Sequence, residues 1–349
     1  KEQIVDPATG KVIAEVPEAS EDQIIAAVEG AHAAFASWAR VVPKDRATML
    51  LKLADRVEAE AQEFAELESR NCGKPLAAAL NDEIPAIADV FRFFAGAARM
   101  QHGSAAGEFI PGYTSMIRRD PIGVIASIAP WNYPLMMAAW KLSPALAAGN
   151  TVVIKPSEQT PLTTLKLAQL MAEIFPPGVV SVICGRGKSV GAPLIARPEV
   201  RMISLTGDVS TGQKILDSAA KGLKRTHLEL GGKAPVIVFD DADLESVVSG
   251  VRAFGFYNAG QDCTAACRLY AGPKIYDRLV RNLTEAAASL KVGAQTEEGV
   301  EMGPLITASQ RSRVAGFVAR AAEKRHIEIT TGGKARPGSG FFYEPTIVA

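Results

Sequence analysis

Four short apolar, β-branched runs recur through the middle of this 349-residue chain and constrain its fold more than any other feature. They begin near Val124, Thr151, Val179 and Met202, at intervals of 27, 28 and 23 residues. Helical patterns such as 162–174 and 189–196 separate them. Strands that alternate with helices at this period predict right-handed crossovers and a parallel sheet. Such a sheet binds ligands outside the carboxyl ends of its strands.

The flanking segments predict further elements. The first hundred residues have helical patterns over 20–38, 43–70 and 82–100, and Ser20 with Gln23 resembles a capping box. Glycine and proline punctuate the aromatic, β-branched stretch 107–120, which predicts a hairpin. After the central region we expect strands at 236–239 and 269–271, with helices between them and over 275–290.

Charge and composition exclude several classes of protein. The chain has 38 basic and 38 acidic residues, so a nucleic acid or an anionic membrane is not expected as its main partner. The first ten residues lack the apolar region of a signal peptide, and prolines interrupt the uncharged stretch 121–140. Four scattered cysteines and four unclustered histidines predict neither a disulfide framework nor a metal site. We therefore predict a cytoplasmic protein.

Two glycine-rich loops follow predicted strands. Gly185, Gly187 and Gly191 do not match the dinucleotide fingerprint G-x-G-x-x-G. Gly207 and Gly212 flank 208–211 between a strand and a helix, where backbone N–H groups can face a phosphate. Ordinary turn glycines are the alternative at both places.

A lysine and a carboxylate follow the strand that begins at Thr151. Glu158 at a strand end can accept both ribose hydroxyls of an adenosine, and Lys155 can bind a hydroxyl or a phosphate beside it. A solvated loop is the alternative interpretation.

One cysteine and one glutamate are candidates for covalent and acid–base chemistry. Cys263 follows Gly-Gln-Asp and precedes an expected helix over 264–267, whose dipole would stabilise a thiolate. The other three cysteines are expected to be inert core residues. Glu229 lies between two leucines and before two glycines, so partial burial would raise its pKa toward that of a general base. An exposed glutamate on an edge strand is the alternative.

An asparagine between two prolines ends the first strand of the central region. Asn132, held between Pro130 and Pro134, is a rigid amide donor that can stabilise an oxyanion together with a backbone N–H. A proline-rich turn is the alternative.

These motifs occur in the order of the aldehyde dehydrogenase superfamily, which the chain resembles along its whole length. The 34-residue step from Glu229 to Cys263 also matches that family, as do the segments 301–305 and 343–346. Within it, the segments 68–76, 82–98 and 257–268 are most similar to bacterial 4-aminobutyraldehyde dehydrogenases of putrescine degradation. Betaine aldehyde dehydrogenases are near relatives.

The resemblance implies NAD-dependent oxidation of an aminoaldehyde to its acid. Cys263 would attack the aldehyde, Asn132 would hold the oxyanion, Glu229 would activate the hydrolytic water and Lys141 would relay protons. Tyr133, Trp140 and Tyr257 could line an aromatic tunnel for a cationic amine. The residues implied in NAD binding are Pro130, Trp131, Lys155, Pro156, Ser157, Glu158, Gly187, Gly191, Gly207, Asp208, Val209, Ser210, Thr211, Gly212 and Leu230.

The expected fold is α/β and aldehyde dehydrogenase-like, with three parts. A doubly wound parallel-sheet NAD domain comprises 1–106 and 121–232, an oligomerisation hairpin comprises 107–120, and an α/β catalytic domain comprises 233–349. The resemblance also implies a homo-oligomer, a dimer or a tetramer.

Two departures from the family pattern qualify this expectation. Asp208 stands where the family has serine, and its charge would repel a phosphate unless it turns outward. The family continues beyond Ala349 with a Glu-Phe-Gly-Pro segment and a C-terminal strand, so the catalytic domain is expected to be incomplete here. The alternatives are a betaine-type or broad-specificity dehydrogenase and a non-catalytic remnant that binds NAD or assembles with partners.

Overall fold

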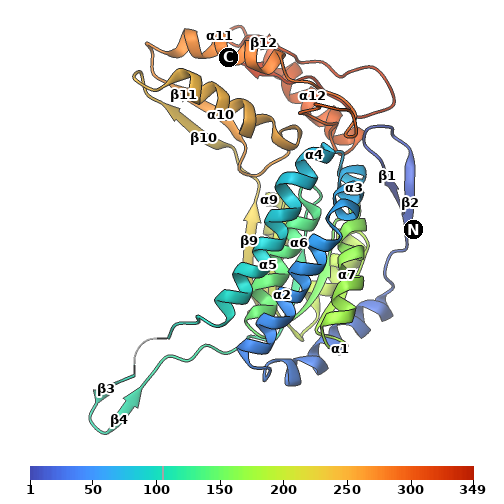
Figure 1. The fold of residues 1–349 in the computed structure, drawn as a ribbon, viewed down its shortest axis with the longest axis vertical. Coiled ribbons are helices and arrows are strands. Elements are labelled where there is room, and N and C mark those ends of the chain that lie inside the picture. Colours follow the sequence, from blue (N-terminus) through green and yellow to red (C-terminus); the bar gives the residue numbers. More distant parts are fainter. Residues whose placement is uncertain (104–105) are drawn as a thin grey trace. The chain divides into compact units, whose positions relative to one another are not determined.

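The computed structural model describes residues 1–103 and 106–349 and divides into two units (Figure 1). Unit 1 comprises Lys1–Glu2, Val16–Phe64 and Asp82–Glu229. Unit 2 comprises Gln3–Glu15, Ala65–Asn81 and Leu230–Ala349. Segments 3–15 and 65–81, expected with the NAD domain, thus belong with the C-terminal part. Residues 104 and 105, within the expected segment 1–106, lie outside the described residues.

Unit 1 is built on a five-stranded sheet with the order β7-β6-β5-β8-β9. Its strands are β5 (Val124–Ile128), β6 (Thr151–Lys155), β7 (Val180–Val182), β8 (Val200–Gly207) and β9 (Arg225–Leu230). β5 pairs in parallel with both β6 and β8, so that Val124 lies opposite Thr151 on one side and Val200 on the other. The predicted parallel sheet is confirmed. From β5 the chain first adds β6 and β7 on one side and then β8 and β9 on the other, so the strand order reverses between β5 and β8.

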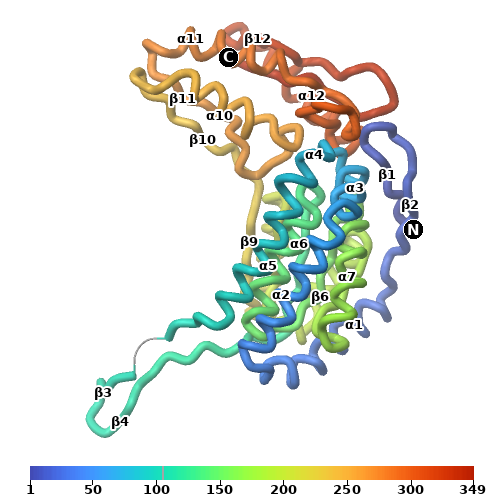
Figure 2. The backbone as a smooth tube through the Cα atoms, viewed as in Figure 1, coloured from blue at the N-terminus to red at the C-terminus, as the bar shows by residue number. Residues whose placement is uncertain are grey.

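Two groups of helices cover this sheet. In the first group, α6 (Pro134–Ala147) and α7 (Leu162–Ile174) pack against α2 (Pro43–Ala59) and α5 (Ile84–Ala98), as Figure 2 shows. α1 (Glu21–Trp38), α8 (Ala192–Ala196) and α9 (Val209–Lys221) form the second group, with η2 (Gly187–Gly191) before α8. Because crossovers keep one hand, the reversal of strand order puts α9 on the face opposite α6 and α7.

The N-terminal region contains strands that the sequence analysis missed. β1 (Glu2–Val5) and β2 (Val12–Val16) pair with each other before α1 begins. The capping box at Ser20 is confirmed, with Gln23 N donating to its hydroxyl.

The helix expected over 43–70 is two helices, α2 and α3 (Ala61–Cys72), because the chain turns out of α-helical geometry at Glu60 (φ −107°, ψ 23°). α4 (Leu76–Ala78) and the π-helical turn η1 (Ala79–Glu83) lead into α5.

The predicted hairpin is also confirmed. β3 (Gly107–Ile110) and β4 (Tyr113–Ser115) are antiparallel, and Gly112 supplies the positive φ of +82° at the turn. Its side chains are apolar and exposed, including Phe109 at 78% and Tyr113 at 68%. A hairpin with this surface is typical of an assembly contact, and that role stays a prediction.

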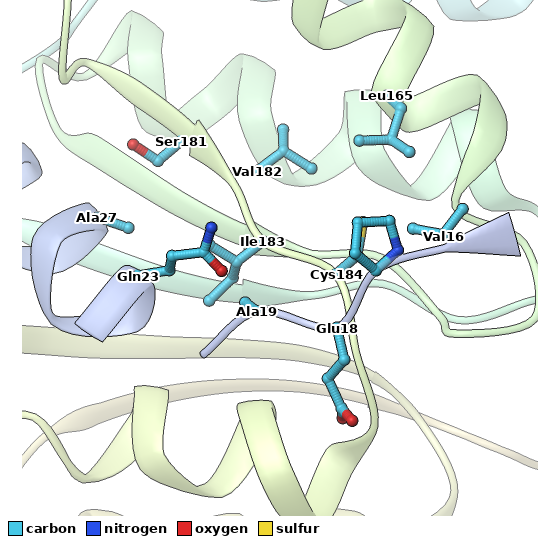
Figure 3. Close-up of a pocket in the computed structure, with 11 residues that line it drawn as sticks. Val16, Glu18, Ala19, Gln23, Ala27, Leu165, Ser181, Val182, Ile183 and Cys184 are labelled. Carbon is cyan, nitrogen blue, oxygen red and sulfur yellow. The ribbon is translucent and has the colours of Figure 1, made fainter. Parts of the chain in front are cut away.

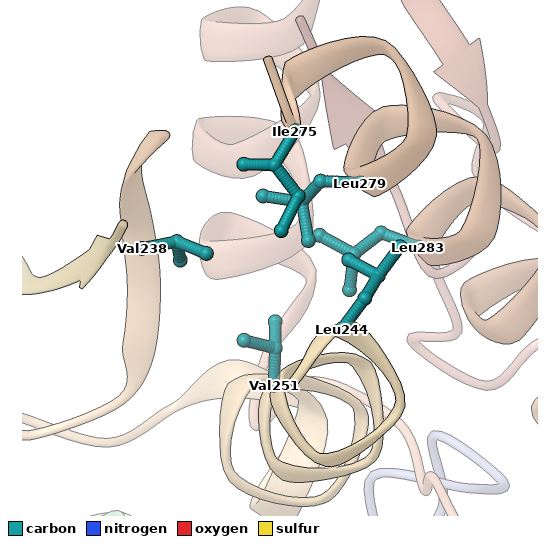
Figure 4. Packing of buried hydrophobic residues seen from close by; sticks show 6 residues of the cluster. All are labelled: Val238, Leu244, Val251, Ile275, Leu279 and Leu283. Carbon is teal, nitrogen blue, oxygen red and sulfur yellow. The ribbon is translucent and has the colours of Figure 1, made fainter. Parts of the chain in front are cut away.

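Unit 2 has its own hydrophobic core (Figure 4). β10 (Ala234–Val238) and β11 (Ala266–Ala271) are parallel and are joined through α10 (Leu244–Phe256), with the 3₁₀ turn η3 (Tyr257–Gly260) after it. α11 (Tyr276–Ala288) packs against α10. The core cluster consists of Val238, Leu244, Val251, Ile275, Leu279 and Leu283.

Towards its C-terminal end, unit 2 contains α12 (Ala308–Ala322) and the antiparallel pair β12 (Ile329–Thr331) and β13 (Ile347–Val348). None of the described helices is both long enough and apolar enough to cross a membrane.

Candidate active site

Two chain segments follow the carboxyl ends of the central strands in the sheet of unit 1. After β5 the chain bends through Trp131, Asn132 and Tyr133 and enters α6 at Pro134. After β8 it enters α9 through Asp208. These strands are neighbours in the sheet but their helices run to opposite faces, which is the arrangement that opens a ligand crevice. Asn132 and the 207–212 segment therefore flank the same strand-order reversal.

A buried lysine lies behind this edge. Lys141 on α6 is only 6% exposed, and its Nζ donates to Ser204 Oγ on β8 at 3.1 Å. Burial lowers the pKa of the Lys141 amine to about 7, although the Glu229 carboxylate acts in the opposite direction. An amine that gains and loses a proton near neutral pH suits the proton-relay role expected of it.

The structure adds two residues that the sequence analysis missed. Ser204 Oγ lies 3.2 Å from Nδ1 of His227 on β9. Half-buried Glu229 is two residues further along the same strand, so the two side chains project from the same face of β9. The i, i+2 spacing of His227 and Glu229 was visible in the sequence, but the strands and helix that bring Ser204 and Lys141 to them were not.

Lys155 and Glu158 form a second polar group at the end of β6. Lys155 is 2% exposed, and its Nζ donates to the carbonyls of Pro156 at 2.8 Å and Gly185 at 2.9 Å. A Glu158 carboxylate oxygen lies 3.6 Å away, and Glu158 is partly exposed. Burial lowers the pKa of Lys155, with Glu158 opposing the shift. The pair presents a donor and an acceptor to a diol, which fits the predicted ribose site.

The loop that holds the Gly185 carbonyl is packed against the N-terminal segment. Gly185 has φ +140°, and a Cβ there would lie 2.4 Å from Val190 Cγ2 and 2.6 Å from Glu18 Cγ. Glu18 accepts from Ser189 Oγ and from the Arg186 amide, and these hydrogen bonds hold its pKa below the usual range. Glycine is therefore required at 185 by both conformation and space.

A cavity of about 500 Å³ lies between the N-terminal segment 16–27 and the segment 181–184 that ends β7 (Figure 3). Val16, Ala19, Gln23 and Ala27 line it opposite Leu165 and the segment 181–184. Its lining contains none of the predicted site residues.

The remaining predicted cofactor residues lie at the same edge of unit 1. Pro130 and Trp131 are half-buried after β5, whereas Pro156 and Ser157 are buried after β6, where Ser157 Oγ accepts from Gln159 N at 3.2 Å. Gly191 of η2 packs beside Lys155, since a Cβ there would lie 3.7 Å from its side-chain carbons. Gly187 begins the same turn.

Asp208 is the N-cap of α9. Its Oδ1 accepts from Ser210 N at 2.8 Å, and its carbonyl accepts from Thr211 N and Gly212 N. Serine, the residue expected from the family, caps helices equally well. The aspartate therefore keeps the cap and adds a negative charge at the helix end, beside Gly207 and the exposed Val209, where a phosphate is expected.

Cys263 lies in unit 2, in a turn and not before a helix. Asp262 Oδ1 accepts from both the amide (2.7 Å) and the hydroxyl (2.8 Å) of Thr264, and β11 starts at Ala266. The helix expected over 264–267 is wrong, because the aspartate turn directs these residues into parallel pairing with β10. The predicted helix dipole at this thiol is therefore wrong as well.

Local contacts hold the backbone before Cys263. Asn258 and Gln261 donate through their side-chain amides to each other's carbonyls, and Ile306 N donates to Gln261 Oε1 at 2.9 Å. Asn258 has φ +51°, a conformation that asparagine tolerates better than most residues.

The glycine pair after Glu229 approaches this turn. A Cβ on Gly232 would lie 3.4 Å from the Cys263 carbonyl oxygen, and Ala234 pairs with Ala266. Segments 230–233 and 263–265 thus enter the two-stranded sheet side by side. Leu230, a predicted cofactor residue, ends β9 at the start of this stretch.

The other cysteines differ from one another. Cys72 and Cys184 are buried as expected, and burial raises the pKa of the Cys184 thiol to about 11. Cys267, also expected in the core, is exposed on β11, so that expectation is wrong. Cys263 is half-buried.

In terms of the two units, the predicted residues separate into two sets. Asn132, Lys141, Glu229 and the cofactor residues other than Leu230 belong to unit 1, and Cys263 with Leu230 belongs to unit 2. Within unit 1 the structure gathers the predicted cofactor residues at one edge of the sheet. A donor–acceptor pair beside a helix N-terminus fits an adenosine ribose and a pyrophosphate.

Comparison with known proteins finds one family over the whole chain. The model of the aldehyde dehydrogenase family matches residues 1–349. A betaine aldehyde dehydrogenase from Bacillus subtilis is 42% identical over 352 residues, covering 99% of this chain and 71% of the relative. A phenylacetaldehyde dehydrogenase from Pseudomonas fluorescens is 40% identical over 354 residues, covering 99% of this chain and 70% of the relative.

Solved structures agree with this match. An aldehyde dehydrogenase from Bacillus cereus, determined as an NAD+ complex, superposes with a TM-score of 0.96 at 38% identity. The match covers 99% of this chain and 71% of that one. The expected aldehyde dehydrogenase fold is confirmed.

We predict that Asp208→Ser tightens the binding of NAD. Serine keeps the N-cap but removes the carboxylate, so the repulsion of a pyrophosphate at the start of α9 falls. An effect of about 1 kcal/mol corresponds to a roughly fivefold lower Kd, measurable by isothermal titration. Asp217→Ser, exposed on the same helix two turns further on, is the control. Equal Kd values for Asp208→Ser and the unaltered chain would show that the charge is harmless.

We also predict that Lys141→Met stabilises the fold at low pH. Folding lowers the Lys141 pKa from 10.5 to about 7, so the unfolded chain binds more protons than the folded one across that window. The free energy of unfolding therefore rises with pH there, and the full cost of burying the ammonium applies below it. Methionine removes this cost, so its advantage is on the order of 2 kcal/mol or more at pH 6 and shrinks towards pH 10.

Urea unfolding at pH 6, 8 and 10 measures this difference. Lys214→Met, at an exposed position of α9, is the matched control and should show no such trend. A stability difference for Lys141→Met that stays constant with pH would contradict the lowered pKa.

Proposed function

The chain belongs to the aldehyde dehydrogenase family, and from this premise we propose that it oxidises an aminoaldehyde, 4-aminobutanal, to 4-aminobutanoate with NAD. The match over residues 1–349 is the observation that carries aldehyde oxidation. Family membership makes the protein an NAD-dependent aldehyde dehydrogenase, while the substrate and the roles of individual residues are our proposal. Such an activity would serve putrescine degradation.

The proposed chemistry begins at Cys263. Its thiolate attacks the aldehyde carbon, and the Asn132 amide with the Cys263 backbone N–H stabilises the oxyanion of the thiohemiacetal. NAD, when bound, accepts the hydride, which leaves an acyl thioester on Cys263.

Hydrolysis of this thioester is the proposed task of Glu229 and Lys141. Glu229 takes a proton from the attacking water, so that hydroxide adds to the thioester carbon and the cysteine thiolate leaves. Lys141, with its pKa lowered to about 7, is able to take up and pass on the proton that Glu229 gains.

Residues at the carboxyl edge of unit 1 would hold the cofactor. Lys155 and Glu158 would bind the adenosine ribose, and the 207–212 turn at the N-terminus of α9 would face the pyrophosphate. The Glu158 carboxylate would repel a 2′-phosphate, which favours NAD over NADP.

Aromatic side chains support a cationic substrate. Trp140 on α6 is 54% exposed. The next residue, Lys141, is buried in the core. Tyr133 is the half-buried N-cap residue of the same helix, seven residues before Trp140, and both rings would line the substrate site. An indole face attracts an ammonium group, and this attraction favours an aminoaldehyde over a neutral aldehyde.

A betaine-type dehydrogenase is the second candidate. The Bacillus subtilis relative named for betaine aldehyde is 42% identical, and trimethylammonium groups are also bound by aromatic rings. The ratio of kcat/KM for 4-aminobutanal to that for betaine aldehyde separates the two candidates.

Assembly into a homo-oligomer is part of the proposal. The exposed apolar hairpin of β3 and β4 is a suitable contact surface for a second copy of the chain.

We predict that Glu229→Gln separates the two halves of the reaction. The variant should still give a rapid burst of NADH, while steady turnover falls by roughly 10²- to 10⁴-fold because the water lacks its base. Cys263→Ala should give neither phase, and Cys267→Ala, at the exposed cysteine nearby, should give both. Stopped-flow absorbance measures the phases. Equal loss of burst and turnover in Glu229→Gln would remove its assigned role.

We further predict that Trp140→Ala raises KM for 4-aminobutanal about two- to fivefold, the value of an exposed cation–π contact, and leaves KM for propanal unchanged. Phe93→Ala, at an exposed aromatic residue on α5, is the control. Steady-state kinetics with both aldehydes measures this effect. An equal rise for the two aldehydes would argue against a cationic substrate at Trp140.

A further inference from the structure

We propose that Ser204 and His227 form a proton route that connects the buried amine of Lys141 with solvent. The inference rests on the proposed function, since its task is to remove the proton that Glu229 takes from the hydrolytic water. In this proposal, the side chains of Ser204 and His227 act through Lys141 and not on the substrate directly.

The geometry is that of a continuous hydrogen-bonded chain. Lys141 Nζ donates to Ser204 Oγ at 3.1 Å, and Ser204 Oγ lies 3.2 Å from His227 Nδ1. Because Lys141 Nζ donates to the hydroxyl oxygen, the hydroxyl proton points to Nδ1 in the tautomer that carries its proton on Nε2. Each link is within the range of a hydrogen bond along which a proton moves.

Exposure increases in steps along this chain. Lys141 is 6% exposed and Ser204 is 7% exposed, whereas His227 is an exposed residue of β9. The amine is therefore largely shielded from bulk water, whereas the imidazole at the end of the chain is exposed. Three different elements, α6, β8 and β9, contribute one residue each.

The proton transfers balance without another reactant. The Glu229 carboxyl group gives its proton to the Lys141 amine, which becomes an ammonium. The ammonium releases a proton to Ser204 Oγ as the hydroxyl proton of Ser204 moves to His227 Nδ1. His227 then releases the proton on Nε2 to water, and Glu229 and Lys141 are restored to carboxylate and amine.

Burial of the Lys141 amine favours this direction, and the Glu229 carboxylate opposes it. Glu229 and Arg225 share the face of β9 on which His227 lies, with Glu229 on the inner side and Arg225 exposed. Burial lowers the pKa of Lys141 to about 7, so its ammonium releases a proton at neutral pH. The imidazole of His227 has two ring nitrogens, so it can accept a proton on one and release a proton from the other.

An activated ester tests the route without the hydride step. p-Nitrophenyl acetate acylates the Cys263 thiolate with a burst of p-nitrophenol, and the steady rate that follows reports hydrolysis of the acyl-enzyme. We expect His227→Ala and Ser204→Ala to keep the burst and to slow the steady rate about tenfold, less than the 10²- to 10⁴-fold contribution of a direct general base.

Added imidazole provides a readout that a merely structural role would not change. In His227→Ala, free imidazole fills the vacated space beside Ser204 and restores the steady rate. In Ser204→Ala the chain is broken before the imidazole, so the rate stays low. His326→Ala, at an exposed histidine of unit 2, is the control and should neither slow hydrolysis nor respond to imidazole.

The outcomes distinguish a failure of the proton route from a failure of the proposed function. Rescue of His227→Ala alone supports the route. An unchanged steady rate in His227→Ala, or equal responses of both variants to imidazole, overturns the route and leaves the proposed function standing. Absence of a burst from the unaltered chain overturns the proposed function and this inference together.

Discussion

The reversal of strand order between β5 and β8 is the constraint on which the arrangement of unit 1 depends. All parallel strands end at the same edge, and helices that leave neighbouring strands for opposite faces cannot cover the edge between them. Asn132 follows one of these strands and Asp208 the other, so both loops occupy the uncovered edge. The side chains there need not be close in sequence, because the sheet brings them together.

Two lysines are buried near that edge, and the structure offsets the cost differently for each. Lys155 donates to two carbonyls and has Glu158 nearby, and these oxygens offset part of the desolvation that lowers its pKa. In the described residues, Lys141 donates to one hydroxyl and has the Glu229 carboxylate as its opposing charge. Desolvation therefore dominates at Lys141, and its pKa falls to about 7. Lys155, with three oxygen atoms around its amine, suits binding, whereas Lys141, whose pKa falls to about 7, suits proton transfer.

Local hydrogen bonds, and not the edge of a sheet, position Cys263, the candidate nucleophile. Asp262 directs the chain through a turn into β11, and the paired amides of Asn258 and Gln261 hold the preceding backbone. Gly232 lies beside this turn, where an added Cβ would be 3.4 Å from the Cys263 carbonyl oxygen. In an aldehyde dehydrogenase, the family to which the chain belongs, these contacts would hold the proposed nucleophile in place.

The sequence by itself determined the parallel sheet, the hairpin, the capping box at Ser20 and the order of the chemical motifs. These depend on periodicity and on residues a few positions apart, which local physical rules describe well. It misjudged the residues after Cys263, because pairing with β10, some thirty positions earlier, outweighed a short local helix preference. Only the tertiary structure decided that Lys141, Ser204 and His227 form one hydrogen-bonded chain and that Lys141 loses its proton near neutral pH. Hydrogen bonds between three separate elements, and the desolvation of an amine among them, depend on packing that no single stretch of sequence encodes.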